Sequence, residues 1–284
     1  MSAVLGQPLI GFARSAGRAG GVRLDGVTIA LTLALVLLGL VMVTSASVSI
    51  ASRETGQPFY YLERQLLLVG VGTACAALVF SLRTEWLERA SGPLLAVALV
   101  LLVLVLLPGL GHAVNGSRRW LHIAGVNFQV SELARVLVLV YVASYAVRRE
   151  GQLRESLTGL VKPLALLALA AALLLAEPDF GAATVLFAAG FGLLFLAGAR
   201  LRYVLAMMAL AAGGFALLAL GSSYRVRRLT TFLDPWADPW HSGFQLTQSL
   251  IAIGRGQWLG VGLGESVQKL FYLPEAHTDF LFAV

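Results

Sequence analysis

Long apolar stretches joined by short polar connections fill residues 27–221 of the chain. A helix needs about 20 mostly apolar residues to cross the hydrocarbon core of a bilayer, and seven stretches are close to that length. The predicted spans are residues 27–50, 65–82, 92–107, 130–147, 160–176, 182–199 and 203–220. The pattern therefore predicts an all-α fold, a polytopic bundle of membrane helices.

An eighth apolar run begins at Phe280 and reaches Val284, the last residue of the sequence. Such a short run cannot cross a bilayer. We therefore interpret residues 280–284 as the start of an eighth span and expect the natural chain to continue.

The hydropathy pattern changes between the seventh span and this last run. Residues 222–279 are rich in polar side chains but also contain aromatic and aliphatic ones. Loops longer than about 15 residues are uncommon in compact proteins and are usually functional or disordered, and this composition argues against disorder. We predict that residues 222–279 form a large loop that carries the working surface of the protein.

Two local patterns stand out within this loop. Leu246, Leu250 and Ile253 have helical spacing, which predicts an amphipathic helix over residues 244–253 with these side chains packed on the core. Glycines then recur at residues 254, 256, 260, 262 and 264. They indicate either a turn whose backbone N–H groups approach a ligand closely or a flexible hinge.

Composition supports the membrane interpretation. The 284 residues are 58% hydrophobic and only 13% charged, whereas soluble domains have about 25% charged residues. The net charge is +6, but most Lys and Arg residues border the apolar stretches, which indicates membrane topology rather than nucleic-acid binding. The single cysteine, Cys75, lies in an apolar stretch and excludes a disulfide framework within this chain.

Basic residues in the connections predict the orientation, because Lys and Arg accumulate on the cytoplasmic side. With residues 1–26 as a cytoplasmic tail, eleven Lys and Arg residues fall in short inside segments. Residues 27–221 then form the membrane bundle, and residues 222–279 form a periplasmic loop. Five basic residues of that loop run against the bias: Arg225, Arg227, Arg228, Arg255 and Lys269. They indicate an anionic ligand at the outer face or an ion network with Asp234 and Asp238.

Arginines also lie in the two shorter outer connections. Arg118 and Arg119 stand between Ser117 and Trp120, and this combination of bidentate donors, a hydroxyl and an aromatic face suits a phosphate or a sugar. Arg64 follows an aromatic segment at the predicted membrane edge. It is either part of an aromatic belt with snorkelling charges or a ligand for a phosphate.

Charged residues near the span ends allow two interpretations each. Glu132 and Arg135 are three residues apart on the fourth span, so they form either a structural ion pair or part of a polar cavity. In the short connection after the fifth span, Asp179 is explained by capping the next helix. Glu177 in the same connection has no such simple explanation.

Three titratable residues, Glu275, His277 and Asp279, close the loop where it re-enters the membrane. Asp279 directly precedes an apolar run, so we expect it to be partly desolvated, with a raised pKa that suits a proton acceptor. The alternative is that Asp279 caps the eighth helix. One histidine and two carboxylates are not a zinc signature.

Several segments, in the same order along the chain, carry a family resemblance. They are residues 64–65, 116–121, 131–134, 178–181, 248–254, 262–269 and 272–280, the last reading Tyr-Leu-Pro-Glu-Ala-His-Thr-Asp-Phe. Together they resemble the SEDS family (shape, elongation, division and sporulation) of polytopic cell-wall polymerases, and most closely its cell-division branch in Gram-negative bacteria. Val130 stands where the family usually has proline, and Arg135 where lysine is common. The family has about ten spans.

The resemblance implies a peptidoglycan glycosyltransferase that polymerises lipid II, a disaccharide-pentapeptide on undecaprenyl diphosphate, during septal wall synthesis. It implies Asp279 as the general base on the acceptor sugar hydroxyl, with the lipid diphosphate as leaving group and inversion at the anomeric carbon. The residues implied to bind substrate are Arg64, Arg118, Arg119, Glu132, Arg135, Gln248, Ser249, Lys269 and His277. A divalent cation, Mg²⁺ or Mn²⁺, is left open, with Asp279 as its only candidate ligand.

The resemblance also implies partners and a location. These are the growing glycan strand, a class B penicillin-binding transpeptidase of the FtsI type, divisome regulators and membrane lipid, at the septum in the inner membrane; nucleic acid is not among them. Two other functions fit the residues. One is a flippase that moves lipid II across the membrane, and the other is a non-enzymatic scaffold of the divisome.

Overall fold

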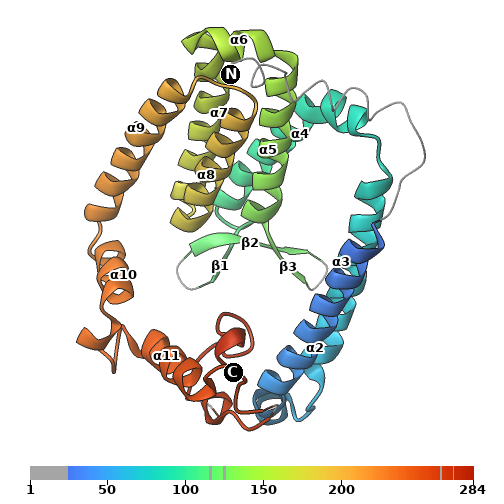
Figure 1. The fold of residues 1–284 in the computed structure, drawn as a ribbon, viewed down its shortest axis with the longest axis vertical. Coiled ribbons are helices and arrows are strands. Elements are labelled where there is room, and N and C mark those ends of the chain that lie inside the picture. Colours follow the sequence, from blue (N-terminus) through green and yellow to red (C-terminus); the bar gives the residue numbers. More distant parts are fainter. Residues whose placement is uncertain (1–24, 115–116, 124–125, 263, 271) are drawn as a thin grey trace, which may run out of the picture. The chain divides into compact units, whose positions relative to one another are not determined.

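The computed structural model of the chain describes residues 25–114, 117–123, 126–262, 264–270 and 272–284 (Figure 1). Its helices are α2 (Gly26–Thr55), α3 (Tyr60–Ser81), α4 (Thr84–Leu106), α5 (Val130–Arg148), α6 (Glu150–Glu155), α7 (Leu157–Ala176), α8 (Phe180–Leu196), α9 (Leu201–Leu220), α10 (Ser223–Leu233) and α11 (Phe244–Gly256). The strands are β1 (His112–Val114), β2 (Ser117–Ile123) and β3 (Val126–Gln129), and the short 3₁₀ helices are η1 (Pro235–Ala237), η2 (Val267–Lys269) and η3 (Leu281–Ala283).

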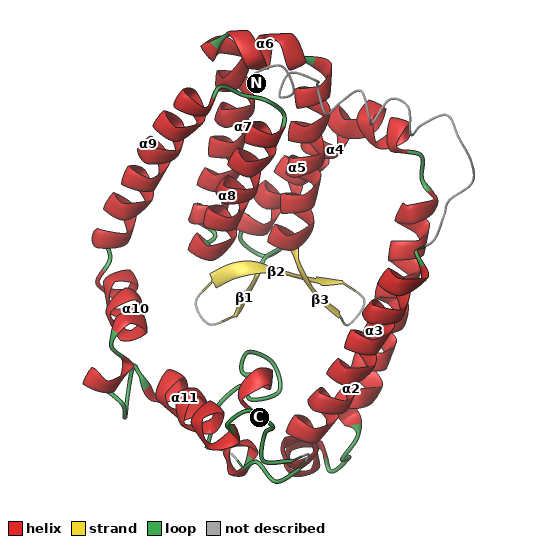
Figure 2. Ribbon diagram, viewed as in Figure 1, coloured by secondary structure: helices red, strands yellow, loops and turns green. Residues whose placement is uncertain are grey.

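Each of the seven predicted spans is a helix in the structure, namely α2, α3, α4, α5, α7, α8 and α9. Six of them are long and apolar enough to cross a membrane, and α8 is an apolar helix of 17 residues. The predicted helix bundle is thus confirmed (Figure 2). The cytoplasmic position of the N-terminus and the division into tail, bundle and periplasmic loop stay predictions.

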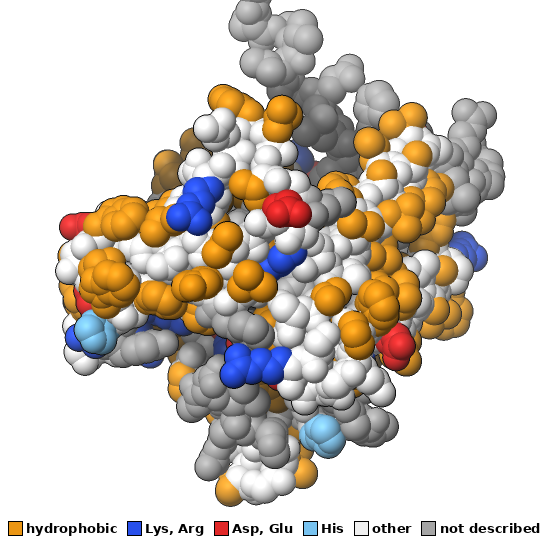
Figure 3. All heavy atoms as spheres, turned by 90° about the horizontal axis from the view of Figure 1, so that it is seen from below, with side chains coloured by type: hydrophobic (Ala, Val, Ile, Leu, Met, Phe, Trp, Pro, Cys, Tyr) orange, Lys and Arg blue, Asp and Glu red, His pale blue; other side chains and the backbone are white. Residues whose placement is uncertain are grey.

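Large apolar side chains are exposed along these helices. Val27 and Leu35 on α2 are 68% and 69% exposed, and Leu217 on α9 is 74% exposed. Figure 3 shows many apolar side chains on the surface of one face of the protein. Soluble proteins rarely expose large contiguous apolar patches, so contact with lipid accounts for this surface.

The chain divides into two compact units. The first joins the residues up to Thr73 with Thr230–Val284, and the second is Ala74–Leu229. In the second unit, α4 packs on α5, α5 on α8, and α7 on α8. Fully buried side chains of this core include Leu102, Val138, Leu167, Leu186 and Leu194.

Close approach of α7 and α8 depends on a glycine. A Cβ atom placed on Gly190 would lie 2.5 Å from Cδ1 of Leu167, whereas one placed on Gly192 would meet nothing within 4 Å. We expect Gly190→Ala to destabilise the protein by about 1–3 kcal/mol through overpacking. Gly192→Ala on the same helix is the matched control and should be neutral or slightly stabilising. Thermal unfolding in detergent measures both, and equal melting temperatures would contradict this packing.

A small antiparallel sheet, in the order β1-β2-β3, connects α4 to α5. In the β2–β3 pair, Trp120 is opposite Gln129 and Leu121 is opposite Phe128. Leu121 packs against the core of the second unit. The sequence did not predict these strands. The sheet positions Arg119 and Gln129 beside the N-terminal end of α5.

In the first unit, the predicted amphipathic helix is α11, but its predicted buried face is wrong. Leu250 and Ile253 are each 42% exposed, whereas Thr247, Ser249 and Ala252 are buried. Small side chains face inward because α11 lies close to the preceding turn. The hydroxyl group of Thr247 donates to the carbonyl oxygen of Gly243 over 3.0 Å.

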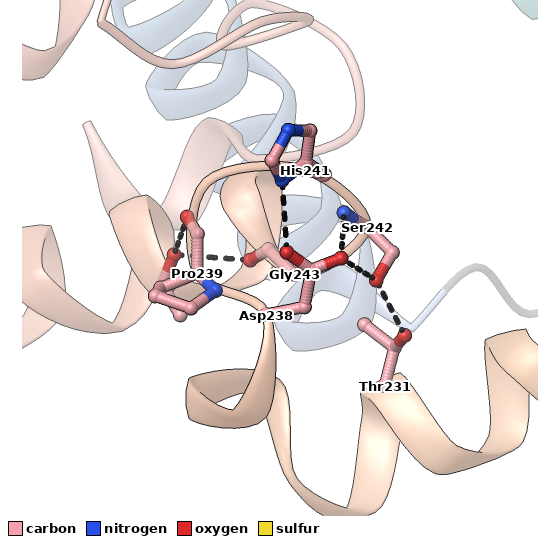
Figure 4. Close-up of polar contacts among 7 residues, drawn as sticks. Thr231, Asp238, Pro239, His241, Ser242 and Gly243 are labelled. Atoms are coloured by element: carbon pink, nitrogen blue, oxygen red, sulfur yellow. Dashed lines mark hydrogen bonds and ion pairs between the residues drawn. The ribbon is translucent and has the colours of Figure 1, made fainter.

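That turn is organised around Asp238 (Figure 4). Its carboxylate accepts hydrogen bonds from the backbone N–H of Ser242 (3.1 Å) and from the Ser242 hydroxyl (2.9 Å), and it pairs with Nδ1 of His241 (3.0 Å). These bonds lower the pKa of Asp238 to about 2, the two from Ser242 most strongly. Thr231 joins the turn by donating to Oγ of Ser242 over 3.3 Å. Asp238 therefore orders the loop locally.

The glycine-rich segment is a set of tight turns. Gly260, Gly262 and Gly264 have φ angles of 78°, 105° and 93°. Residues with a side chain rarely adopt this backbone conformation. Gly254 and Gly256 belong to α11. The segment lines a cavity of about 580 Å³ within the first unit, together with parts of α2, α11 and η2.

Candidate functional site

The second unit holds a polar cluster where α5, α8 and β2 meet. We call Arg119, Gln129, Ser131, Glu177 and Asp179 the α7–α8 cluster, since two of them lie in the three-residue connection between those helices. Within the connection, Pro178 has a φ angle of +33°. The two acidic residues, Glu177 and Asp179, are almost fully buried.

Asp179 holds the cluster together. Its side chain caps α8 by accepting the N–H of Ala182 over 3.0 Å, which confirms the predicted cap. The same carboxylate accepts the hydroxyl of Ser131 over 3.2 Å and pairs with Nη1 of Arg119 at 3.6 Å. Gln129 in turn donates to Oγ of Ser131 over 3.0 Å. The sequence predicted the cap but missed the ion pair, which joins residues 60 positions apart.

Glu177 is the other acidic residue of the cluster, and it is 0% exposed. Burial and, to a smaller extent, the nearby carboxylate of Asp179 raise the pKa of Glu177 from 4.5 to about 8, although the charge of Arg119 acts in the opposite direction. A buried carboxyl keeps its proton because desolvation penalises the charged form. Glu177 is therefore largely a neutral acid at neutral pH.

Arg119 reaches from the buried cluster toward the surface. Its side chain is 33% exposed, and its Nε is buried without a hydrogen-bond partner among the residues that the structure describes. A guanidinium that pairs with a buried carboxylate and stays partly exposed suits a phosphate oxygen. Arg118 precedes it on β2, and its side chain lies outside the described part.

The predicted ion pair on α5 is confirmed, since Nη2 of Arg135 contacts Oε2 of Glu132. Glu132 does not face the bundle interior, however, because its side chain is 59% exposed. A surface position is less costly for its charge than a buried one. A role of this pair in shaping a cavity stays a prediction.

The other predicted binding residues lie in the first unit. Arg64 is exposed and donates to the Tyr60 hydroxyl over 3.0 Å, with its guanidinium 5.7 Å from the ring centre. Lys269 ends η2, and its carbonyl oxygen accepts the Ser49 hydroxyl over 3.3 Å. The Lys269 contact involves only its backbone, and the Arg64 contact uses only one nitrogen of its guanidinium.

Two predicted binding residues lie on α11. Gln248 is partly buried. Ser249 is buried, and its hydroxyl donates to the carbonyl oxygen of Leu246 over 2.8 Å. Because its proton already has an acceptor within the helix, Ser249 is a poor donor to a substrate in this conformation.

His277 packs against the start of α3. Its ring centre lies 4.7 Å from that of Tyr61, whose hydroxyl donates to Glu54 over 2.9 Å. Nδ1 of His277 is buried and has no hydrogen-bond partner among the described residues. The contact joins residues 216 positions apart, and it orients the segment that carries Asp279.

Asp279 itself differs from both sequence predictions. It is exposed, so the expected partial desolvation is wrong. It is not a helix cap either, because Phe280 is the N-cap of η3 and has no side-chain cap bond. Both differences arise because the backbone turns at Glu275, whose φ angle is 55° and whose carbonyl oxygen accepts the Asp279 N–H over 3.0 Å. The carboxylate is thus open to an incoming hydroxyl group.

Within the described ranges, no three or more His, Cys, Asp or Glu side chains are grouped so that they could hold a metal ion. Asp279 alone offers one carboxylate, whereas Mg²⁺ is usually bound by carboxylates together with substrate phosphates. Among the residues that the structure describes, Asp279 therefore supplies at most one carboxylate ligand to a divalent cation.

An apolar cavity of about 210 Å³ lies among α7, α8 and α9 of the second unit. It is lined by Ala168, Ala171, Ala172, Leu175, Phe187, Ala211, Gly214, Phe215 and Leu218. Phe215 packs edge-on against Phe180 at 5.3 Å. Arg225 donates to the carbonyl oxygen of Leu218 over 2.8 Å and lies 5.4 Å from the Phe180 ring centre. A cation therefore stands beside one end of an apolar cavity.

A family model described as a cell cycle protein, FtsW/RodA/SpoVE, matches residues 26–284. The chain belongs to the FtsW/RodA/SpoVE family. This membership confirms the resemblance found in the motifs. With its apolar helices, it also makes the chain a multi-pass membrane protein.

Two similar relatives each bear the name "Probable peptidoglycan glycosyltransferase FtsW". The one from Thioalkalivibrio sulfidiphilus is 56% identical over 263 residues, which cover 92% of this chain and 66% of the relative. The one from Alkalilimnicola ehrlichii is 54% identical over 271 residues, which cover 94% of this chain and 68% of that relative. The chain therefore spans about two thirds of the length of these FtsW/RodA/SpoVE relatives.

Solved structures of the FtsW/RodA/SpoVE type share the fold. One, described as "Structural coordination of polymerization and crosslinking by a peptidoglycan synthase complex", has a chain that matches with a TM-score of 0.63 and 30% identity, covering 82% of this chain and 66% of that one. Thermus thermophilus rod shape determining protein RodA matches with a TM-score of 0.56 and 27% identity. The match covers 91% of this chain and 80% of the RodA chain.

Proposed function

We propose that this chain is the larger part of a peptidoglycan glycosyltransferase that polymerises lipid II at the outer face of the cytoplasmic membrane. The observation that carries the proposal is its 56% identity over 263 residues to a relative with that enzyme name. The described residues add the required chemistry: an accessible carboxylate, a positioned guanidinium and an apolar cavity.

In the proposed reaction, Asp279 takes the proton from the acceptor sugar 4-hydroxyl. The acceptor oxygen forms a bond to the anomeric carbon of the donor glycan, and the bond from that carbon to the lipid diphosphate breaks with inversion. The diphosphate leaves as an anion and needs no acid to protonate it. Exposure of Asp279 supports this role because a large sugar must reach the carboxylate.

Cationic side chains would stabilise the charge of the departing diphosphate. Arg119 is the best supported, since its side chain is one third exposed and pairs with Asp179 at 3.6 Å. Arg118 and Arg64 are further candidates. Preorganised donors of this kind are each typically worth about 3 kcal/mol in the transition state.

The lipid chain of the substrate also needs an apolar surface. The cavity among α7, α8 and α9 supplies one, with Arg225 beside it as a partner for a phosphate group. We also propose a class B penicillin-binding transpeptidase and divisome regulators as partners, and the septum as the location. The support is the peptidoglycan synthase complex among the similar structures.

The test uses the full-length protein, purified with its transpeptidase partner and given lipid II in detergent. The proposed function predicts glycan polymer and one lipid diphosphate released for every glycosidic bond formed. A flippase would make no polymer because the substrate is already accessible. A scaffold would neither make polymer nor require Asp279 for cell growth. Absence of polymer from an otherwise folded, assembled complex would refute the proposal.

A further inference from the structure

The segment that carries Asp279 folds as a compact turn within the first unit, and we call residues 275–280 the Asp279 turn. Glu275 has a φ angle of 55°, a conformation that is costly for a residue with a side chain and persists only where the surrounding structure holds it. Its carbonyl oxygen accepts the backbone N–H groups of Thr278 (3.2 Å), Asp279 (3.0 Å) and Phe280 (3.3 Å). The Thr278 hydroxyl also donates to the Glu275 carboxylate over 2.9 Å. The residues of the turn are therefore fixed relative to one another.

Two neighbouring residues attach the Asp279 turn to the rest of the first unit. Ala276 is 0% exposed and belongs to a buried cluster with Leu273 and with Ala252 of α11. His277 packs against α3, where its ring centre lies 4.7 Å from that of Tyr61, with 49° between the ring planes. Aromatic rings at this separation attract each other. Because alanine offers only a methyl group, the larger contact between His277 and Tyr61 is the one that can set the orientation of the turn.

Tyr61 is itself held in place at the corner between α2 and α3. Its hydroxyl donates to Oε2 of Glu54 over 2.9 Å. Glu54 lies in the last turn of α2, Gly56 follows as the C-cap with a φ angle of 72°, and Tyr61 is the second residue of α3. The bond therefore spans the corner and limits rotation of the Tyr61 ring. Since Glu54 is exposed, water competes for this bond and its contribution is modest.

We propose that Tyr61 is a positioning residue for Asp279: its ring supports His277, and His277 holds the Asp279 turn in the orientation that presents the carboxylate to the acceptor hydroxyl. The Asp279 side chain is exposed, so its position is set mainly by the backbone that carries it. Tyr61 takes no part in the proton transfer. The inference rests on the proposed function only in assigning Asp279 as the base.

Loss of the Tyr61 ring should impair the chemical step more than substrate binding. A displacement of about 1 Å can lower the rate of an enzymatic reaction about 10²-fold. We therefore expect Tyr61→Ala to lower kcat by about 10²-fold, with KM for lipid II within about threefold of the native value. Tyr61→Phe keeps the ring and loses only the bond to Glu54, so its kcat should stay within about fivefold of native.

Hydrogen exchange follows the Asp279 turn without any need for catalysis. The amides of Thr278 and Asp279 are protected by their bonds to the Glu275 carbonyl oxygen, and their exchange reports local opening of the turn. In a peptide that covers residues 275–280, we expect exchange on the order of tenfold faster in Tyr61→Ala than in native protein. Exchange in Tyr61→Phe should stay near the native rate, because the ring contact remains.

The experiment compares the native full-length complex with Tyr61→Ala, Tyr61→Phe and Phe59→Ala by kcat, KM and hydrogen exchange. Phe59 is the matched control, since it lies in the same corner and its ring is 55% exposed; we expect native values from Phe59→Ala. Tyr61→Leu keeps apolar volume but has no ring, so it should change kcat and exchange in the same direction and replaces Tyr61→Ala if the alanine variant does not fold.

The inference is overturned if a folded Tyr61→Ala or Tyr61→Leu protein keeps either the native kcat or the native exchange rate. It is equally overturned if Tyr61→Phe loses as much as Tyr61→Ala, or if Phe59→Ala causes the same losses. Failure of the proposed function gives a different result, namely no polymer from the native complex, and the exchange measurement still decides whether Tyr61 holds the turn.

Discussion

The Asp279→Asn substitution should lower the rate of lipid II polymerisation by about 10²–10⁴-fold, the usual contribution of a general base. The amide has nearly the same shape but cannot accept the acceptor sugar proton. Folding should be unaffected, because Asp279 is exposed and does not cap η3. Initial rates of polymer formation by the full-length protein, with melting temperature alongside, measure the effect.

The matched control for this experiment is Glu275→Gln. Glu275 lies in the same segment, is exposed, and accepts the Thr278 hydroxyl over 2.9 Å, a bond that glutamine can keep. We expect it to retain nearly the native rate. A native rate in Asp279→Asn, or an equal loss in both variants, would remove Asp279 from the role of base.

Removal of the Arg119 side chain should lower kcat by about 10²–10³-fold, the effect of deleting one preorganised electrostatic donor. Arg119→Ala also leaves the buried carboxylate of Asp179 without its cation, so the melting temperature should fall. Arg119→Lys separates the two effects, because lysine keeps the charge but not the planar fork that binds phosphate oxygens. We expect it to recover most of the stability and only part of the rate.

Arg83→Ala serves as the control for loss of an arginine. Arg83 pairs with Glu85, and its side chain is 73% exposed. Exposed ion pairs contribute about 0–1 kcal/mol, so both rate and stability should stay near native. The assignment of Arg119 fails if Arg119→Ala, folded and assembled with its partner, retains the native kcat.

The membrane helices could be predicted from sequence because their signal is local. A span is a continuous apolar run, and neighbours in sequence reveal it without knowledge of the fold. The strands β1 to β3 escaped prediction because they are short and carry charged side chains such as Arg119. Short strands depend on their partners for stability.

The candidate site could be predicted only in its local parts. The cap by Asp179 and the Glu132–Arg135 pair span three residues each, and both are present. The Arg119–Asp179 pair is a tertiary contact that spacing cannot reveal. On α11, apolar spacing identified the helix but not its buried face, because the hydroxyl groups of Thr247 and Ser249 donate to nearby carbonyl oxygens and can therefore be buried.

The role of Asp279 as the base in polymerisation is tested most directly by polymer formation from the full-length protein in liposomes, with lipid II confined to the outer leaflet, on the periplasmic side. If Asp279 is the general base, the native protein makes glycan strands and Asp279→Asn makes almost none at equal protein incorporation. Glycan strands of normal length from Asp279→Asn, or no strands from the native complex, would contradict it.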